Sequence, residues 1–189
     1  MIHSVERILR ILSALLLIFI YTTEGKSQEW NSARLTVLYG SNITFNFNTL
    51  DKIKNGIEIV SGTSLGISLT DNNIPGHDLT GFVLNFRSFN GQTDIQGEAF
   101  TLPLDRIRVR AIDFLGLSGG TSNGYQLLAT GWLPLFSYTD LTWSDLSWST
   151  HQLTISYDCG TGLRSLLGEK PDYYNVEVEL ELMPTGSGF

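Results

Sequence analysis

The sequence predicts an all-β protein, a single antiparallel β-sandwich of the immunoglobulin-like or jelly-roll type with about nine strands and little or no helix. Apolar residues recur with a period of two, and turn signals separate the apolar runs. The one cysteine excludes a disulfide within the chain. Strands with one apolar and one polar face are typical of antiparallel sheets. Two such sheets packed together bury their apolar rows, and the polar rows are expected to face solvent.

The first 27 residues have the pattern of an export signal. Arg7 and Arg10 precede an apolar run from Ile11 to Tyr21. A run of about eleven residues is the length of a signal-peptide core and is too short to cross a bilayer of about 30 Å as a helix. We therefore expect residues 1–27 to be removed on export, no membrane span afterwards, and a protein that is secreted or held at the cell surface.

The remaining residues are expected to form one domain, with the sandwich over 28–184 and a flexible tail over 185–189. Residues 28–189 carry 9 Lys and Arg against 17 Asp and Glu, a net charge of −8, compared with −7 for the whole chain. An acidic protein repels phosphate groups, so nucleic acid is not an expected partner. Electrostatic attachment to anionic lipid is disfavoured for the same reason.

The expected strands follow the alternation of apolar and polar residues along the chain. In 105–113 three arginines alternate with apolar residues, and in 175–184 three glutamates do the same. A turn or two of helix is expected in 161–170. The expected strands are 34–40, 42–48, 56–60, 63–71, 81–89, 105–113, 124–132, 151–160 and 175–184.

The segment 139–160 carries the strongest candidate for a binding site. Trp143 and Trp148 lie there, with Asp140 and Asp145 close by in the sequence. Exposed aromatic rings beside carboxylates are how sugar-binding sandwiches stack pyranose rings and bind hydroxyl groups. These four residues are therefore candidate carbohydrate-binding residues, and packing in the core or at its rim is the competing role for the two tryptophans.

The second half of that segment predicts a core strand. Leu153, Ile155, Tyr157 and Cys159 share one face, so Cys159 is expected to be a buried, unreactive thiol. His151 heads the same row and is expected to lie at the rim or to cap the strand.

A calcium site is the only metal or cofactor site that the sequence suggests. Asp71, Asn73 and Asp78 offer oxygen ligands within one loop. The loop does not follow the spacing of a twelve-residue calcium loop, and Asp and Asn also favour ordinary turns. Only two histidines follow the export signal, which is too few for a three-histidine zinc site.

A small secreted hydrolase is an alternative with weak support. Ser64 and Ser118 each lie in a Gly-x-Ser-x-Gly match, but neither is followed by a helical pattern. Three alternating glutamates, Glu177, Glu179 and Glu181, have a spacing that paired catalytic carboxylates could use. We interpret them instead as charge that keeps an edge strand from pairing.

The leading functional hypothesis is a non-enzymatic surface module with a structural or adhesive role. It would assemble with itself through strand edges such as 34–40 or 175–184, or bind surface glycans. An eight-stranded outer-membrane barrel is a further alternative. The export signal and the disulfide-free all-β pattern are similar in style to bacterial secreted surface and fimbria-like β-sandwich proteins. That resemblance rests on no specific motif and implies a location in the bacterial envelope, not an activity.

Overall fold

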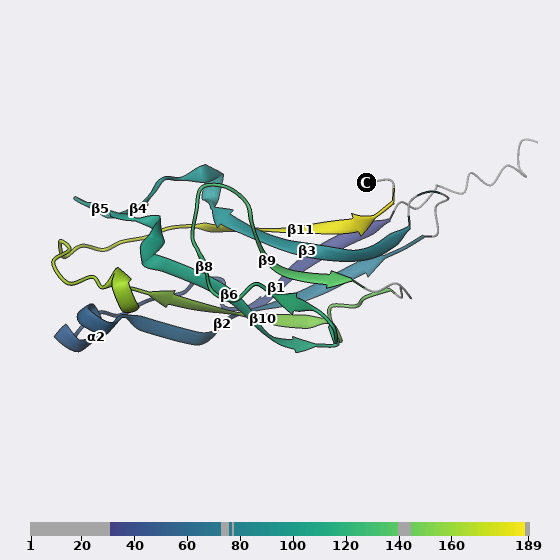
Figure 1. The fold of residues 1–189 in the computed structure, drawn as a ribbon, viewed down its shortest axis with the longest axis horizontal. Helices are drawn as coiled ribbons and strands as arrows, with labels where there is room; N and C mark the ends of the chain where they lie inside the picture. Colours follow the sequence, from purple (N-terminus) through teal and green to yellow (C-terminus); the bar gives the residue numbers. More distant parts are fainter. Residues whose placement is uncertain (1–30, 73–75, 77, 140–144, 188–189) are drawn as a thin grey trace, which may run out of the picture. The chain divides into compact units, whose positions relative to one another are not determined.

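Two antiparallel sheets pack face to face in the computed structural model, which describes residues 31–72, 76, 78–139 and 145–187 (Figure 1). Residues Asn31–Phe189 form one compact unit. The predicted antiparallel β-sandwich is confirmed. The export signal expected over residues 1–27 lies outside the described residues, and no described helix is long and apolar enough to cross a membrane.

Within the described part of the chain, the larger sheet has five strands and the smaller has four. In spatial order the larger sheet consists of β1 (Ser32–Tyr39), β2 (Ile57–Thr70), β10 (Gln152–Cys159), β6 (Ile107–Leu115) and β8 (Gln126–Leu127). The smaller consists of β11 (Val178–Gly186), β3 (Leu79–Ser88), β9 (Leu133–Thr139) and β7 (Thr121–Ser122). A separate hairpin joins β4 (Asp94–Gln96) to β5 (Thr101–Pro103).

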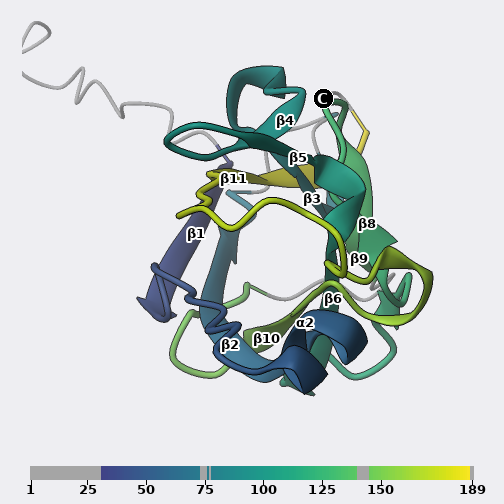
Figure 2. The same cartoon turned by 90° about the vertical axis from the view of Figure 1, so that its left-hand side faces the viewer.

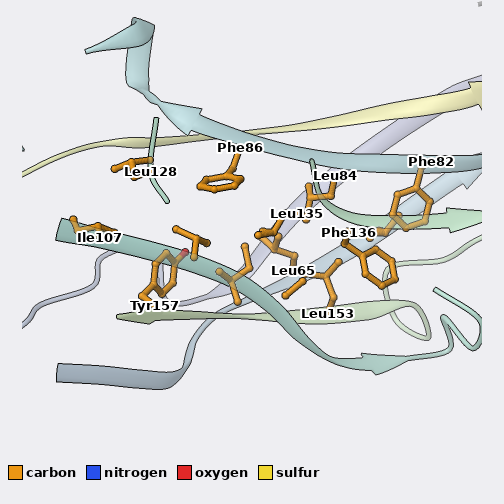
Figure 3. Close-up of a cluster of buried hydrophobic side chains, with 14 of the residues drawn as sticks. Leu65, Phe82, Leu84, Phe86, Ile107, Leu128, Leu135, Phe136, Leu153 and Tyr157 are labelled. Atoms are coloured by element: carbon orange, nitrogen blue, oxygen red, sulfur yellow. The ribbon is translucent and has the colours of Figure 1, made fainter. Parts of the chain in front are cut away.

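The core lies between the sheets and is built from the apolar rows that the alternation predicts. Phe82, Leu84 and Phe86 project from β3 toward Leu65 of β2 and Leu153 of β10 (Figure 3). All five side chains are completely buried. Burying a large apolar side chain contributes about 1.5–3 kcal/mol, so these five residues together make a large contribution to the stability of the sandwich.

The expected strands 56–60 and 63–71 are one continuous strand in the structure. β2 runs through both, because it pairs with β10 on either side of a shift in register, through 57–59 and through 63–66. Gly62 lies at this irregularity, where a Cβ would approach the Tyr157 ring to 2.6 Å.

Two other expected strands are shorter or missing. Residues 42–48 form no strand, although Ile43, Phe45 and Phe47 do pack against the core as the alternation predicts. The apolar row is therefore real, but the segment is not part of a sheet. In 124–132 the strand β8 covers Gln126 and Leu127, which pair with β6.

The α-helix found among the described residues lies where no helix was expected. α2 covers Leu50–Asn55, whereas 161–170 contains only the short 3-10 turn η3 (Gly162–Arg164). Thr49 caps α2, because its hydroxyl accepts a hydrogen bond from the Lys52 backbone N–H at 3.2 Å. Gly56 ends the helix with φ of 78°, a conformation that favours glycine.

The expected end of the last strand at Pro184 is wrong. Thr185 and Gly186 continue β11 opposite Gly81 and Leu79, and the Ser187 backbone N–H donates to the Asp78 carbonyl at 3.1 Å. β11 is an edge strand, where a proline that lacks an N–H is tolerated. Thr185 and Gly186 of the expected tail 185–189 therefore belong to β11, and residues 188–189 lie outside the described residues.

Candidate functional site

Trp148 lies on a turn at the outer surface of the larger sheet. Leu146 forms a bridge with Leu69 of β2, and the chain then turns through 147–150 into β10. The Trp148 backbone N–H donates to the Ser68 hydroxyl at 3.0 Å. A Cβ on Gly66 would lie 2.9 Å from the Trp148 Cβ, so this close approach depends on the glycine. The indole remains 49% exposed.

The other predicted sugar-binding residues do not gather around Trp148 in the described structure. Asp145 Oδ1 accepts a hydrogen bond from the Asp71 backbone N–H at 3.0 Å, which ties this segment to the loop after β2. Trp143 and Asp140 lie outside the described residues. The structure therefore gives one half-exposed indole and one carboxylate that already has a backbone partner.

Trp132 is less accessible to a stacking sugar than its exposed fraction suggests. It is 37% exposed, but the Arg87 guanidinium lies 4.3 Å from the centre of its ring. Arg87 is fixed in turn by Glu179 of β11, at 2.7 Å. An arginine held over an indole gains cation–π energy and covers one of the two faces on which a sugar could stack.

The residues predicted for calcium make turn contacts. Asp71 Oδ2 accepts from the Leu79 backbone N–H at 3.0 Å, which closes the loop between β2 and β3. The Asp78 backbone pairs with Ser187, and Asn73 lies outside the described residues. Within the described ranges, no three His, Cys, Asp or Glu side chains come together as metal ligands would. Calcium binding remains a prediction without added support.

Cys159 and His151 lie where the alternation of the strand predicts, in the core and at the start of β10 respectively. Cys159 is a free, buried cysteine, and burial raises the pKa of its thiol to about 12. The thiol is therefore protonated at neutral pH and a poor nucleophile. His151 closes the preceding turn, because its Nδ1 accepts from the Ser147 backbone N–H at 3.1 Å.

Ser64, Glu179 and Glu181, three residues of the serine and glutamate motifs, have structural contacts within the two sheets. Ser64 is buried within β2 and is followed by more strand, so it does not lie on the sharp strand-to-helix turn that exposes a nucleophile. Glu179 pairs with Arg87, and Glu181 accepts from Asn85 at 3.4 Å. The glutamate row is therefore partly engaged within its own sheet and is not free surface charge.

The largest described cluster of interacting polar side chains was not predicted from the sequence. We call it the Arg–Tyr cluster; it consists of Arg108, Arg110, Tyr125, Glu58 and Asp158 on the outer face of the larger sheet. The two guanidinium groups lie 4.6 and 4.4 Å from the centre of the Tyr125 ring. The Tyr125 hydroxyl donates to Glu58 Oε1 at 2.6 Å, and Arg110 reaches the same oxygen at 3.1 Å.

Asp158 is the buried anchor of the Arg–Tyr cluster. Its carboxylate is 2% exposed, and both of its oxygens accept from Arg108 Nε, at 3.1 and 2.9 Å. Ser156, on the same row of β10, is fully buried. The expectation that the polar row of each strand faces solvent is therefore wrong for β10, because long side chains from β6 and the Tyr125 ring cover this central strand.

The Arg–Tyr cluster is suited to holding strands together and not to acid–base chemistry. Burial, and then the hydrogen bond to Glu58, raise the pKa of the Tyr125 phenol, so it stays protonated at neutral pH. The hydrogen bond to Asp158 raises the pKa of Arg108, which keeps the guanidinium charged. The sequence signal was present in the alternation of Arg108 and Arg110, but the cross-strand carboxylates that pair with them are about 50 residues away in the chain.

No family model matches this chain, and no curated protein is significantly similar to it.

Proposed function

We propose that the protein is a non-enzymatic module of the cell surface or extracellular space, with a structural or adhesive role, that associates with a second copy through its β1 edge. The observation that carries the proposal is Val37 on β1. It lies opposite the fully buried Leu65 in the register of the sheet, on the row that faces the core, yet it is 49% exposed. Covering such an apolar edge is what an added strand does.

The sheet edges differ in how well they are protected. β7 and β8 are edge strands of two residues each, too short to recruit a partner strand. β11 contains Pro184, which has no N–H to donate to a further strand and so discourages pairing.

β1 is eight residues long and contains neither proline nor lysine nor an acidic residue. Among the described strands it pairs only with β2, so its other edge has no strand beside it in the same sheet. Tyr39, at the end of β1, is also half exposed. The least protected long edge is therefore also the edge with the most exposed apolar side chains.

Sedimentation velocity of residues 28–189 over a range of concentrations tests this proposal. We expect association that strengthens with concentration in the unaltered protein and is lost in Val37→Lys, because a charge on the core-facing row of an edge blocks pairing. Phe100→Lys is the matched control, since Phe100 is 44% exposed in the turn between β4 and β5. A monomer at every concentration, or equal loss in both variants, refutes the proposal.

Carbohydrate binding by Trp148 is the second candidate, and the half exposure of its indole favours it. Quenching of tryptophan fluorescence by a panel of soluble polysaccharides would detect it, with Trp148→Phe as the variant and Trp132→Phe as the control. The indole of Trp132 is covered by Arg87, so only the Trp148 variant should lose the response. No response to any polysaccharide rules this candidate out.

A further inference from the structure

One end of the sandwich exposes leucines beside basic side chains. We call it the α2 end and define it as α2 together with residues 161–170, the segment that follows β10. The backbone N–H of Leu166 and the hydroxyl of Ser165 both donate to the Ile53 carbonyl, at 3.1 and 3.2 Å, so the segment is fixed to the helix. Figure 2 views this end directly, with α2 and the segment on one side and the β4–β5 hairpin on the opposite side.

Three leucines of the α2 end are directed into solvent. Leu163, in the η3 turn, is fully exposed at 102% of its reference area, and Leu50 and Leu167 are 69% and 59% exposed. Single exposed leucines are ordinary, but several from two connected segments at one end indicate an interaction surface. These three leucines do not contribute to the hydrophobic core. In the segment 161–170 it is Leu166 that packs against the core.

The charge of the α2 end is opposite in sign to that of the whole protein. Its 16 residues carry four basic side chains, Lys52, Lys54, Arg164 and Lys170, against two acidic ones, Asp51 and Glu169, which is a net charge of +2 within a chain of −7. Glu169 is neutralised by Arg106 of the turn before β6, at 2.7 Å. None of the four basic side chains has an ion-pair partner among the described residues.

Three further acidic side chains at this end of the sandwich lie on the opposite side, at the β4–β5 hairpin (Figure 2). Asp94 and Glu98 belong to the hairpin, and Asp172 is held against it, because its Oδ2 accepts from the Ala99 and Phe100 backbone N–H groups at 2.8 and 2.9 Å. The polarity of this end is therefore divided, with basic charge and leucines on the α2 side. Beyond a Debye length of about 8 Å, salt screens the net negative charge of the rest of the domain.

We propose that the α2 end docks on an anionic lipid surface. The exposed leucines enter the boundary between headgroups and acyl chains, and Lys52, Lys54 and Arg164 contact the lipid phosphates. An apolar group flanked by basic side chains is the arrangement that interfacial binding requires, since apolar burial and electrostatic attraction act together there. The inference does not depend on association through β1, which involves a different part of the molecule, and it revises the expectation that net negative charge disfavours anionic lipid.

Vesicle flotation with residues 28–189 tests the docking. This chain contains the whole compact unit Asn31–Phe189 and lacks the apolar run of residues 11–21, which would bind lipid by itself. The probe is phosphatidylcholine vesicles with and without phosphatidylglycerol. We expect binding only with phosphatidylglycerol, and its loss at about 1 M salt, where the Debye length falls to about 3 Å.

Two double variants separate the contribution of the exposed leucines to lipid binding from that of the basic side chains. Leu163→Ser with Leu167→Ser should weaken binding by about tenfold for each leucine. Lys54→Gln with Arg164→Gln should weaken it by about fivefold for each charge. The matched controls are Leu115→Ser and Arg34→Gln, an exposed leucine and an unpaired arginine that lie on strands outside the α2 end. Circular dichroism checks that each variant is folded.

Three results would overturn the docking proposal. The first is no binding to phosphatidylglycerol vesicles. The second is equal binding to neutral vesicles, which would remove the role of the basic side chains. The third is equal loss in the controls. If the protein does not bind vesicles and the leucine variant instead lowers self-association in sedimentation velocity, the surface binds a second copy of the chain and not lipid.

Discussion

Replacing Asp158 by asparagine tests whether the Arg–Tyr cluster stabilises the fold through a buried charge. Asp158→Asn keeps the size of the side chain and removes its charge, so Arg108 loses its ion-pair partner. The carboxylate is 2% exposed and the Arg108 side chain is 26% exposed. Breaking a fully buried pair costs about 3–5 kcal/mol, because the remaining charge cannot be rehydrated.

The expected cost for Asp158→Asn is smaller than that limit. Arg108 reaches water through its exposed part and keeps its contacts with the Tyr125 ring and with the Thr161 hydroxyl, 2.8 Å from Nη2. We therefore expect a loss of about 2 kcal/mol in the free energy of unfolding. For a domain of this size that loss lowers Tm by roughly 4–8 °C.

Urea denaturation of residues 28–189, followed by tryptophan fluorescence, measures this loss. Glu58→Gln is the matched control in the same cluster. Its side chain is 43% exposed and faces Arg110 at 3.1 Å, so solvent screens the pair and the expected cost is below about 1 kcal/mol. If Asp158→Asn costs no more than Glu58→Gln, the burial of Asp158 does not make it the anchor of the cluster, and the reasoning fails.

Two further predictions concern Cys159 and the close contact between β3 and β9. Burial raises the pKa of the Cys159 thiol from 9.0 to about 12, so the folded state holds the proton that the unfolded state releases, and stability should fall as pH rises from about 9 to 12. Cys159→Ala should make that fall shallower in urea titrations at several pH values, and a fall identical to that of the unaltered protein would contradict the assignment. Gly81→Ala should lower Tm by several degrees in thermal melts, because the new Cβ would lie 2.0 Å from the Tyr138 carbonyl oxygen. Gly131→Ala, where no atom lies within 4 Å, should leave Tm unchanged or slightly raised, and equal effects of the two substitutions would count against the close contact.

The alternation of apolar residues predicted the core well, because the face on which a strand residue lies depends only on its position relative to its neighbours in the sequence. Leu153, Ile155, Tyr157 and Cys159 all face the core of the sandwich, as their spacing requires. The alternation could not distinguish a strand from an extended segment without a partner, and for that reason 42–48 was expected to be a strand. Pairing depends on which segments meet in space, and periodicity carries no information about that.

The helix and the polar cluster were missed for different reasons. α2 is six residues long, too short for an apolar period, and only its caps at Thr49 and Gly56 signal it. The Arg–Tyr cluster combines residues from three strands and a connecting loop, so no short motif contains it. The prediction that outward rows are solvated also treats every strand alike, whereas a central strand such as β10 is covered by the long side chains of its neighbours.

Amide hydrogen exchange at β1 tests whether this edge is available to a second copy of the protein. Mass spectrometry would follow exchange of a peptide covering Arg34–Tyr39 in dilute and in concentrated samples of residues 28–189. We predict that protection of this peptide rises with concentration, while a peptide from the central strand β10 stays equally protected throughout, because β10 has neighbours on both sides. Exchange at β1 that is the same at every concentration would contradict association through this edge.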